Sequence, residues 1–574
     1  MAQAFDAIAS DVEQLSEQIR NLERRVSALE SQPANAAAAP SAAHSLALPK
    51  SRAPETWRGF PGPNVSTGAL PVFGKAILGI AGAYLLRALA ESGPIPRLPI
   101  LLVAIVYAAL WLVWAVRTHA TNHFASVTYA ITAALILSPL LWESTVRFQI
   151  LWPPFTAAVL VAFPVLAWAL AWRENLQAIP WVMTVAAVAT ALALIIATRD
   201  LWPFTVGLLA LALLAEATVD LGHRLGIRAV PAIAADFAVW VLIYVMTSPE
   251  GVPSEYRPIG STAITVLCLA LLAIYGGSIG MRSFGLRQRL TIFEIAQAVV
   301  AFVLATFGTL RASPGSGPAL GISFLLAALL CYWGALFRFM APEQNLNRRV
   351  YASFAVALLL TGSLLVFPAN FQAPFLCGAA VTASFLYMRT GKFSLGLHVS
   401  FYLTAAAILS GLLQLAVGAL AGQVPPALDA GAGVVAVSAI LCYAIGSHAS
   451  TDQRKYRFLW IVPCVLVAGA AAALAVMASV RLGSSSGTLT AARLSVVRTM
   501  VTCSAALILG FTGARLKRAE LVWVAYGAIA FGTLKLVFED LRFGNTTSLM
   551  ASLLSYGLIL IVIPRLTLLG KNAS

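Results

Sequence analysis

Long apolar runs separated by short polar links recur from about residue 68 to the end of the chain. A membrane-crossing helix needs about 20 predominantly apolar residues, and about eighteen runs reach that length. Their approximate centres are Gly79, Leu110, Ala134, Val161, Val188, Leu209, Val239, Leu269, Val300, Leu325, Leu359, Val381, Ala407, Val437, Ala470, Ala506, Ala528 and Leu558. The pattern predicts an all-α fold, a polytopic transmembrane helical bundle over residues 68–574.

The first 30 residues show a different pattern, in which apolar residues recur alternately three and four positions apart. These residues are Phe5, Ile8, Val12, Leu15, Ile19, Leu22, Val26 and Leu29. β-Branched residues at heptad position a and leucine at d favour a parallel dimer. We therefore expect residues 1–30 to be a cytoplasmic coiled-coil helix, with a homodimer or a partner protein bound through residues 5–29. The alternative is a short amphipathic helix packed on the membrane or on the protein itself.

Residues 31–67 are rich in alanine, proline and serine and have no apolar periodicity. This composition is typical of a flexible or semi-extended tether. Disorder without a role is the alternative, and the sequence does not separate the two.

The composition excludes a soluble multidomain enzyme. The chain has 60% apolar and 11% charged residues and a mean hydropathy of +0.85, whereas a soluble chain has about 25% charged residues. The net charge of +15 comes from basic residues spread thinly between the apolar runs. A nucleic-acid partner would instead require one basic patch, so we expect membrane lipids and no nucleic acid as partners.

Basic residues alternate between successive links and thereby predict the orientation. If the N-terminus is inside, the inward links carry one to three basic residues each, such as Arg282, Arg287 and Arg289, and the outward links carry none or one. Cytoplasmic loops are enriched in lysine and arginine. We therefore expect a multi-pass protein of the bacterial cytoplasmic (inner) membrane with both termini in the cytoplasm.

Ionisable residues inside the predicted spans fall into two sets. Such residues are costly in the bilayer and normally face protein or water. The outer set, near the outer ends of the spans, is Arg87, Glu91, Arg498, Lys535, Glu539 and Asp540. The inner set, toward the cytoplasmic side, is Lys75, Glu216, Asp220, His223, Asp236 and Glu294. Asp236 and Arg498 stand out because apolar residues flank both on each side.

Each set has two interpretations. Carboxylates that converge near a cation could bind a cation, relay protons or hold a polar headgroup. Alternatively, the charges are structural ion pairs between helices or snorkel to the interface.

The chain has no phosphate-binding loop, nucleophile elbow, zinc-protease motif or dinucleotide fingerprint. Its six cysteines lie singly in apolar runs, where they resemble small buried apolar residues. We therefore expect no metal, no cofactor and no catalytic residue.

Both ends of the membrane region resemble a known family. The first span reads GKAILGIAGAYLLRALAESG, and the closing stretch is LKLVFEDLRFGNTTSLMASLLSYGLILIVIPRL. Together with the heptads and the tether, they resemble bacterial polytopic membrane proteins grouped as domain of unknown function 2339. The resemblance implies that Arg87, Glu91, Lys535 and Asp540 match charged positions of that family. The chain departs from it at residues 545–548, where the family has an aromatic-arginine pair, and the family brings no assigned activity.

Three functions follow as hypotheses. The first is a transporter-like or lipid-handling bundle with a polar path lined by the buried charges. The second is a non-catalytic cell-envelope scaffold that acts through its N-terminal coiled coil. The third and weakest is a membrane glycosyltransferase, since no outward link is long enough for the extramembrane loop that such enzymes usually carry.

Overall fold

The computed structural model describes residues 69–92, 96–119, 122–174, 176–222, 226–339, 341, 344–421, 429–447, 451–484, 491–540 and 546–572. The chain divides into two compact units, Met1–Val65 and Ser66–Ser574, and all described residues belong to the second. The predicted coiled coil (residues 1–30) and tether (residues 31–67) lie outside the described residues, as does His223 of the inner set.

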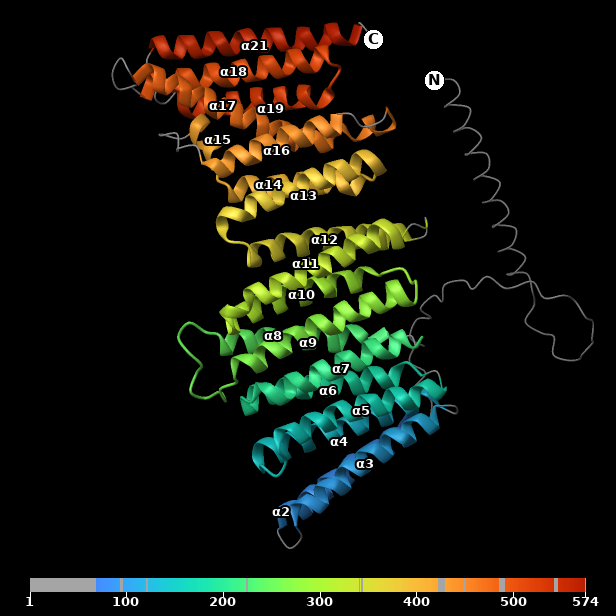
Figure 1. Cartoon of the computed structure of the whole chain (residues 1–574). Helices are drawn as coiled ribbons and strands as arrows, with labels where there is room; N and C mark the ends of the chain where they lie inside the picture. Colours follow the sequence, from blue (N-terminus) through green and yellow to red (C-terminus); the bar gives the residue numbers. More distant parts are fainter. Residues whose placement is uncertain are drawn as a thin grey trace, which may run out of the picture. The chain divides into compact units, whose positions relative to one another are not determined.

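The described part of the chain is all-helical and contains no strand, as the apolar runs predicted (Figure 1). Its α-helices are α2 (Ala69–Ser92), α3 (Arg97–Thr118), α4 (His123–Trp142), α5 (Pro153–Glu174), α6 (Ala178–Thr198), α7 (Leu201–Asp220), α8 (Ala229–Met246), α9 (Ser261–Gly280), α10 (Ile292–Ala312), α11 (Gly317–Trp333), α12 (Asn345–Val366), α13 (Ala369–Thr390), α14 (Phe393–Leu409), α15 (Leu412–Ala421), α16 (Ala430–Ser447), α17 (Ile461–Ser484), α18 (Ala491–Arg515), α19 (Ala519–Lys535) and α21 (Thr546–Asn572). Every expected span centre lies inside one of them.

Sixteen helical segments of the described residues are long and apolar enough to cross a membrane. The bent pair of α14 and α15 makes a seventeenth if it is one span, and α16 is shorter than the rest. α14 and α15 meet at an angle of 69°, because Gly411 between them has a left-handed φ of +71° that ends α14. The protein is thus built from many potential spans, and the number eighteen stays a prediction.

Small residues let neighbouring helices pack closely. α11 packs along α12, and a Cβ added to Gly321 would lie 2.9 Å from the carbonyl oxygen of Gly362. Three of the seven buried residues of α3 are alanines, namely Ala104, Ala108 and Ala115. Large apolar side chains point outward instead, as Leu110 and Ile196 do at 61% and 73% exposure. Helices in lipid associate through small residues in this way.

Four α-helices end in a short π-helical turn, a wider turn that often marks a functional site. These turns are η1 (Glu143–Arg147) after α4, η3 (Met281–Gly285) after α9, η5 (Gly334–Arg338) after α11 and η8 (Leu536–Asp540) after α19. Each turn contains at least one charged residue, and three of them belong to the ion-pair clusters described next.

Candidate functional site

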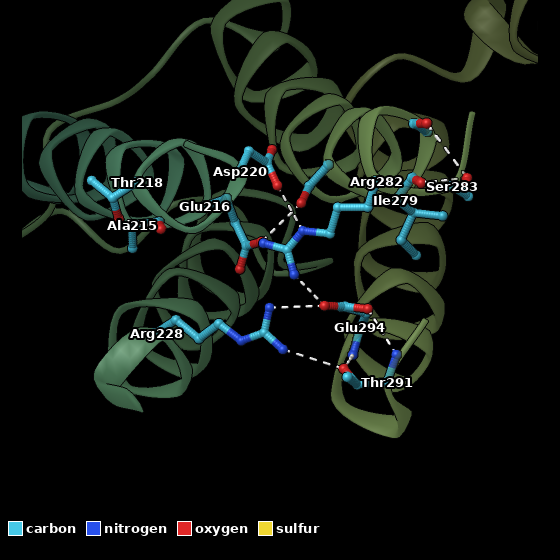
Figure 2. A network of polar contacts seen from close by, with 12 residues as sticks. Ala215, Glu216, Thr218, Asp220, Arg228, Ile279, Arg282, Ser283, Thr291 and Glu294 are labelled. Carbon is cyan, nitrogen blue, oxygen red and sulfur yellow. Dashed lines mark hydrogen bonds and ion pairs between the residues drawn. The ribbon is translucent and has the colours of Figure 1, made fainter. Parts of the chain in front are cut away.

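A buried arginine, Arg282, joins three carboxylates from two other helices (Figure 2). Arg282 lies in η3 and is 3% exposed. Its Nε donates to Asp220 Oδ1 at 2.6 Å, its Nη2 donates to Glu216 Oε2 at 2.8 Å, and its Nη1 donates to Glu294. We call Arg282, Glu216, Asp220, Glu294 and Arg228 the Arg282 cluster.

Glu294 is held by three partners at once. Arg228 donates to Glu294 Oε1 at 2.9 Å, the same oxygen that Arg282 contacts (Figure 2). Glu294 also closes a capping box at the start of α10, because its Oε2 accepts from the Thr291 backbone N–H at 2.8 Å. A capping box satisfies two backbone groups at a helix start. The start of α10 and the ion pair therefore depend on the same carboxylate.

Helix geometry explains why Glu216 and Asp220 meet the same guanidinium. They are four residues apart on α7 and so lie on one face. Glu216 accepts a further hydrogen bond from Ser278 on α9 at 2.8 Å. With three carboxylates and two arginines, the Arg282 cluster carries one surplus negative charge.

An open groove of about 590 Å³ runs between α7 and α9 beside this cluster. Glu216, Asp220 and Ser278 are its polar lining residues, and the remainder is apolar: Val206, Leu209, Ala210, Leu213, Ala217, Leu267, Ala270, Ala273, Ile274, Gly277 and Met281. The groove is open because its alanine and glycine residues fill little of the space between the two helices. Leu213 and Met281 are half exposed on the outer surface of the helices, so the groove faces the lipid if the helices span a membrane.

Asp236 belongs to the same region but not to the ion pairs. Its Oδ2 accepts from Gln297 Nε2 on α10 at 2.6 Å, and Gln297 lies one helical turn beyond Glu294. Its Oδ1 is buried without a hydrogen-bond partner in the described residues. The structure thus brings Glu216, Asp220 and Glu294 together and places Asp236 near them. Lys75 is exposed on α2, which packs on α3 and α4, so the structure does not bring it to the Arg282 cluster.

The outer set separates into two clusters. In the first, Arg87 is 2.9 Å from Glu143 of η1 and 3.4 Å from Glu91, and Arg147 is 3.5 Å from Glu91. Arg87 and Glu91 are four residues apart on α2 and form an ion pair within one helix. These side chains are partly exposed, and such exposed pairs contribute little to stability.

The second cluster of the outer set is deeply buried. Lys535 donates to Asp540 Oδ1 at 2.7 Å, to Thr499 Oγ1 at 2.8 Å and to the Ser495 carbonyl oxygen at 3.0 Å. Arg498 Nη1 donates to Glu539 Oε1 at 3.0 Å. We call Arg498, Lys535, Glu539 and Asp540 the Lys535 cluster. Among the described residues, Arg87 and Glu91 form ion pairs with each other, Glu143 and Arg147, and with no member of the Lys535 cluster.

Arg282, Arg228 and Glu143 belong to these clusters but are not among the site residues predicted from the sequence. Arg282 is taken there as a marker of the cytoplasmic face, although it directly follows an apolar run. The spacing Thr291-x-x-Glu294 was a usable signal, since it is a capping-box pattern. Among the described residues, no group of three or more metal-ligating side chains is arranged to hold a metal ion.

Comparison with known proteins finds no matching family model, curated protein or solved structure. The resemblance to the family of domain of unknown function 2339 therefore stays a prediction.

Proposed function

We propose that this is a lipid-handling, transporter-like protein of the bacterial inner membrane, and that the groove between α7 and α9 holds the acyl chain of a lipid. The observation that carries the proposal is the lining of the groove, which is apolar, with alanine or glycine at five positions, and acidic where Glu216 and Asp220 lie. An amphiphile matches such a lining, with its chain on the apolar part and its polar group at the carboxylates.

The charge of the Arg282 cluster favours a cationic polar group. The cluster has one more carboxylate than it has arginines. An ammonium group, as in an amino-phospholipid, would offset the surplus. When no lipid is bound, Arg282 keeps the carboxylates in place.

A matched pair of glycine variants tests the groove. Gly276 and Gly277 are both exposed, and a Cβ added to either would meet nothing within 4 Å, but only Gly277 lines the groove. In Gly277→Leu, we expect phosphatidylethanolamine binding to fall roughly tenfold, since losing burial of about two methylenes at about 0.8 kcal/mol each corresponds to that factor. Gly276→Leu should bind as the wild type does.

The measurement is retention of labelled phosphatidylethanolamine by the full-length protein in nanodiscs, with phosphatidylglycerol as the anionic comparison. Asp220→Asn keeps the shape of the side chain and removes its charge, so it should weaken binding of phosphatidylethanolamine and leave that of phosphatidylglycerol unchanged. Equal retention by Gly276→Leu, Gly277→Leu and wild type would refute the groove as a lipid site.

The second candidate, a scaffold that acts through residues 5–29, is favoured by the heptad repeat alone. It predicts that deletion of residues 1–32 abolishes the cellular phenotype while Gly277→Leu is silent. The lipid-handling proposal predicts the reverse.

A further inference from the structure

Arg498 has an unused binding edge in the interior of the protein. It lies in α18 and is 3% exposed. Its Nη1 is bound to Glu539, but its Nε and Nη2 are buried and have no hydrogen-bond partner in the described residues. Buried donors are almost always satisfied, so these two nitrogens require an acceptor from elsewhere.

The chemistry of the free edge indicates the acceptor. Nε–H and one N–H of Nη2 point in parallel from the side of the planar guanidinium. Two oxygens of one phosphate or carboxylate group accept such a pair simultaneously. A single carbonyl oxygen would satisfy the edge less well.

The carboxylates nearest to Arg498 are already engaged. Asp540 accepts from Lys535 and from the hydroxyls of Ser495 and Thr499. Glu539 Oε1 accepts from Arg498 Nη1, and its Oε2 lies 3.5 Å from Lys535 Nζ and is buried without a hydrogen-bond partner among the described residues. The Lys535 cluster therefore has two cations and two carboxylates, and Glu539 meets Arg498 only at Nη1, so no carboxylate of the cluster is bound to the Nε–Nη2 edge.

A second unused polar atom lies at the same depth. The Ser552 hydroxyl on α21 is buried without a partner among the described residues. α18 and α21 pack side by side, with Cys503 hydrogen-bonded to Ser555 and Gly510 against Ile563. These two contacts show that α18 and α21 run in the same direction. Counting back along both helices from the contact of Cys503 with Ser555 places Ser552 at about the level of Thr499 and Arg498.

The position of Arg498 is close to the start of its helix. It is seven residues into α18, which corresponds to about 10 Å along the helix axis. Arg493, exposed in the first turn of α18, adds positive charge on that side. If α18 spans a membrane, this depth is within reach of a lipid phosphate as well as of a small anion.

We propose that the Nε–Nη2 edge of Arg498, with the Ser552 hydroxyl, binds a phosphate group between α18 and α21. The phosphate is either the phosphodiester of a phospholipid or free inorganic phosphate, which share this chemistry. The site is separate from the α7–α9 groove and does not depend on the function proposed for it.

The test uses delipidated full-length protein in maltoside micelles at constant ionic strength. Thermal unfolding is followed while inorganic phosphate, phosphatidylglycerol or phosphate-free diacylglycerol is added. We expect the Tm to rise with inorganic phosphate if the ligand is free phosphate, or with phosphatidylglycerol alone if it is a lipid. Equal stabilisation by diacylglycerol, or no stabilisation by any of the three, overturns the proposal.

The variant Arg498→Lys keeps the positive charge but lacks the two parallel donors, so apparent phosphate affinity should fall about tenfold or more. Arg493→Lys on the same helix is the matched control and should bind like wild type. If Arg498→Lys does not fold, the phosphate site is tested instead with Ser552→Ala and with a density map of the wild type. Tetrahedral density at Arg498 Nε and Nη2 supports the proposal, and water or a side chain of this protein there refutes it.

Discussion

Arg282 and Glu294, twelve residues apart in the sequence, form a buried ion pair between η3 and the first turn of α10. The pair closes the link between α9 and α10, and it is reinforced by Glu216 and Asp220 from α7 and by Arg228 before α8. Four helices are thereby tied together at one end of each.

We predict that Arg282→Met strongly destabilises the protein. The substitution preserves much of the side-chain volume but leaves three carboxylates without their shared cation, and breaking a buried pair in this way costs about 3–5 kcal/mol. Denaturant-induced unfolding in micelles measures the loss. Arg289→Met, at an exposed position in the same link, is the control and should change the free energy of unfolding by less than about 0.5 kcal/mol. Equal stability of the two variants would show that the cluster does not clamp the helices.

Thr291→Ala should cost about 0.5–2 kcal/mol. The variant loses the hydroxyl that accepts from the Glu294 backbone N–H and from Arg228 Nη2, so both the helix start and the ion pair weaken. Thermal unfolding in micelles checks this. Thr262→Ala, exposed near the start of α9, should leave the Tm nearly unchanged, and a similar loss in both variants would contradict a specific role for Thr291.

Gly321→Ala should destabilise the contact of α11 with α12 by about 1–3 kcal/mol, the usual cost of overpacking. The added Cβ would lie 2.9 Å from the backbone carbonyl oxygen of Gly362, which cannot move without shifting a helix. Gly378→Ala is the control, because its Cβ meets nothing within 4 Å, and alanine has the better helix propensity. Unfolding of the two proteins should shift in opposite directions, and a stabilised Gly321→Ala would be inconsistent with close packing.

Orientation can be measured with single cysteines. The six native cysteines are buried or partly buried, so background labelling by a membrane-impermeant maleimide should be low. We expect Ser254→Cys, in the exposed link between α8 and α9, to be labelled on intact cells. Gln288→Cys, in the basic link between α9 and α10, should be labelled only after permeabilisation. Labelling of Gln288→Cys on intact cells would show that the orientation in the membrane is the reverse of the predicted one. The outer and inner sets would then exchange sides.

The sequence was sufficient to predict the helices, but not the lateral neighbours of the charged residues. Apolar run length and the alternation of basic links place a residue along the membrane normal, and for this reason Glu216, Asp220 and Glu294 were assigned to the same half. Depth alone could not separate Arg87 from Lys535, which share a predicted level but lie in different clusters. Arg282 was missed because a basic residue directly after an apolar run looks the same whether it ends the helix or continues it in a π-helical turn.

Because Arg282 lies in the π-helical turn η3, the direction of its side chain depends on the number of residues in this five-residue turn. Each residue of an α-helix advances the chain by about 100° around its axis, and a π-helical turn accommodates one extra residue within a helix. Deleting Met281, which precedes Arg282 in this turn, would therefore rotate the arginine by about 100° around the helix axis and move the guanidinium away from α7. Length changes in this short stretch should be far less tolerated than substitutions, although the stretch lies at the end of a helix, where insertions and deletions are ordinarily accepted.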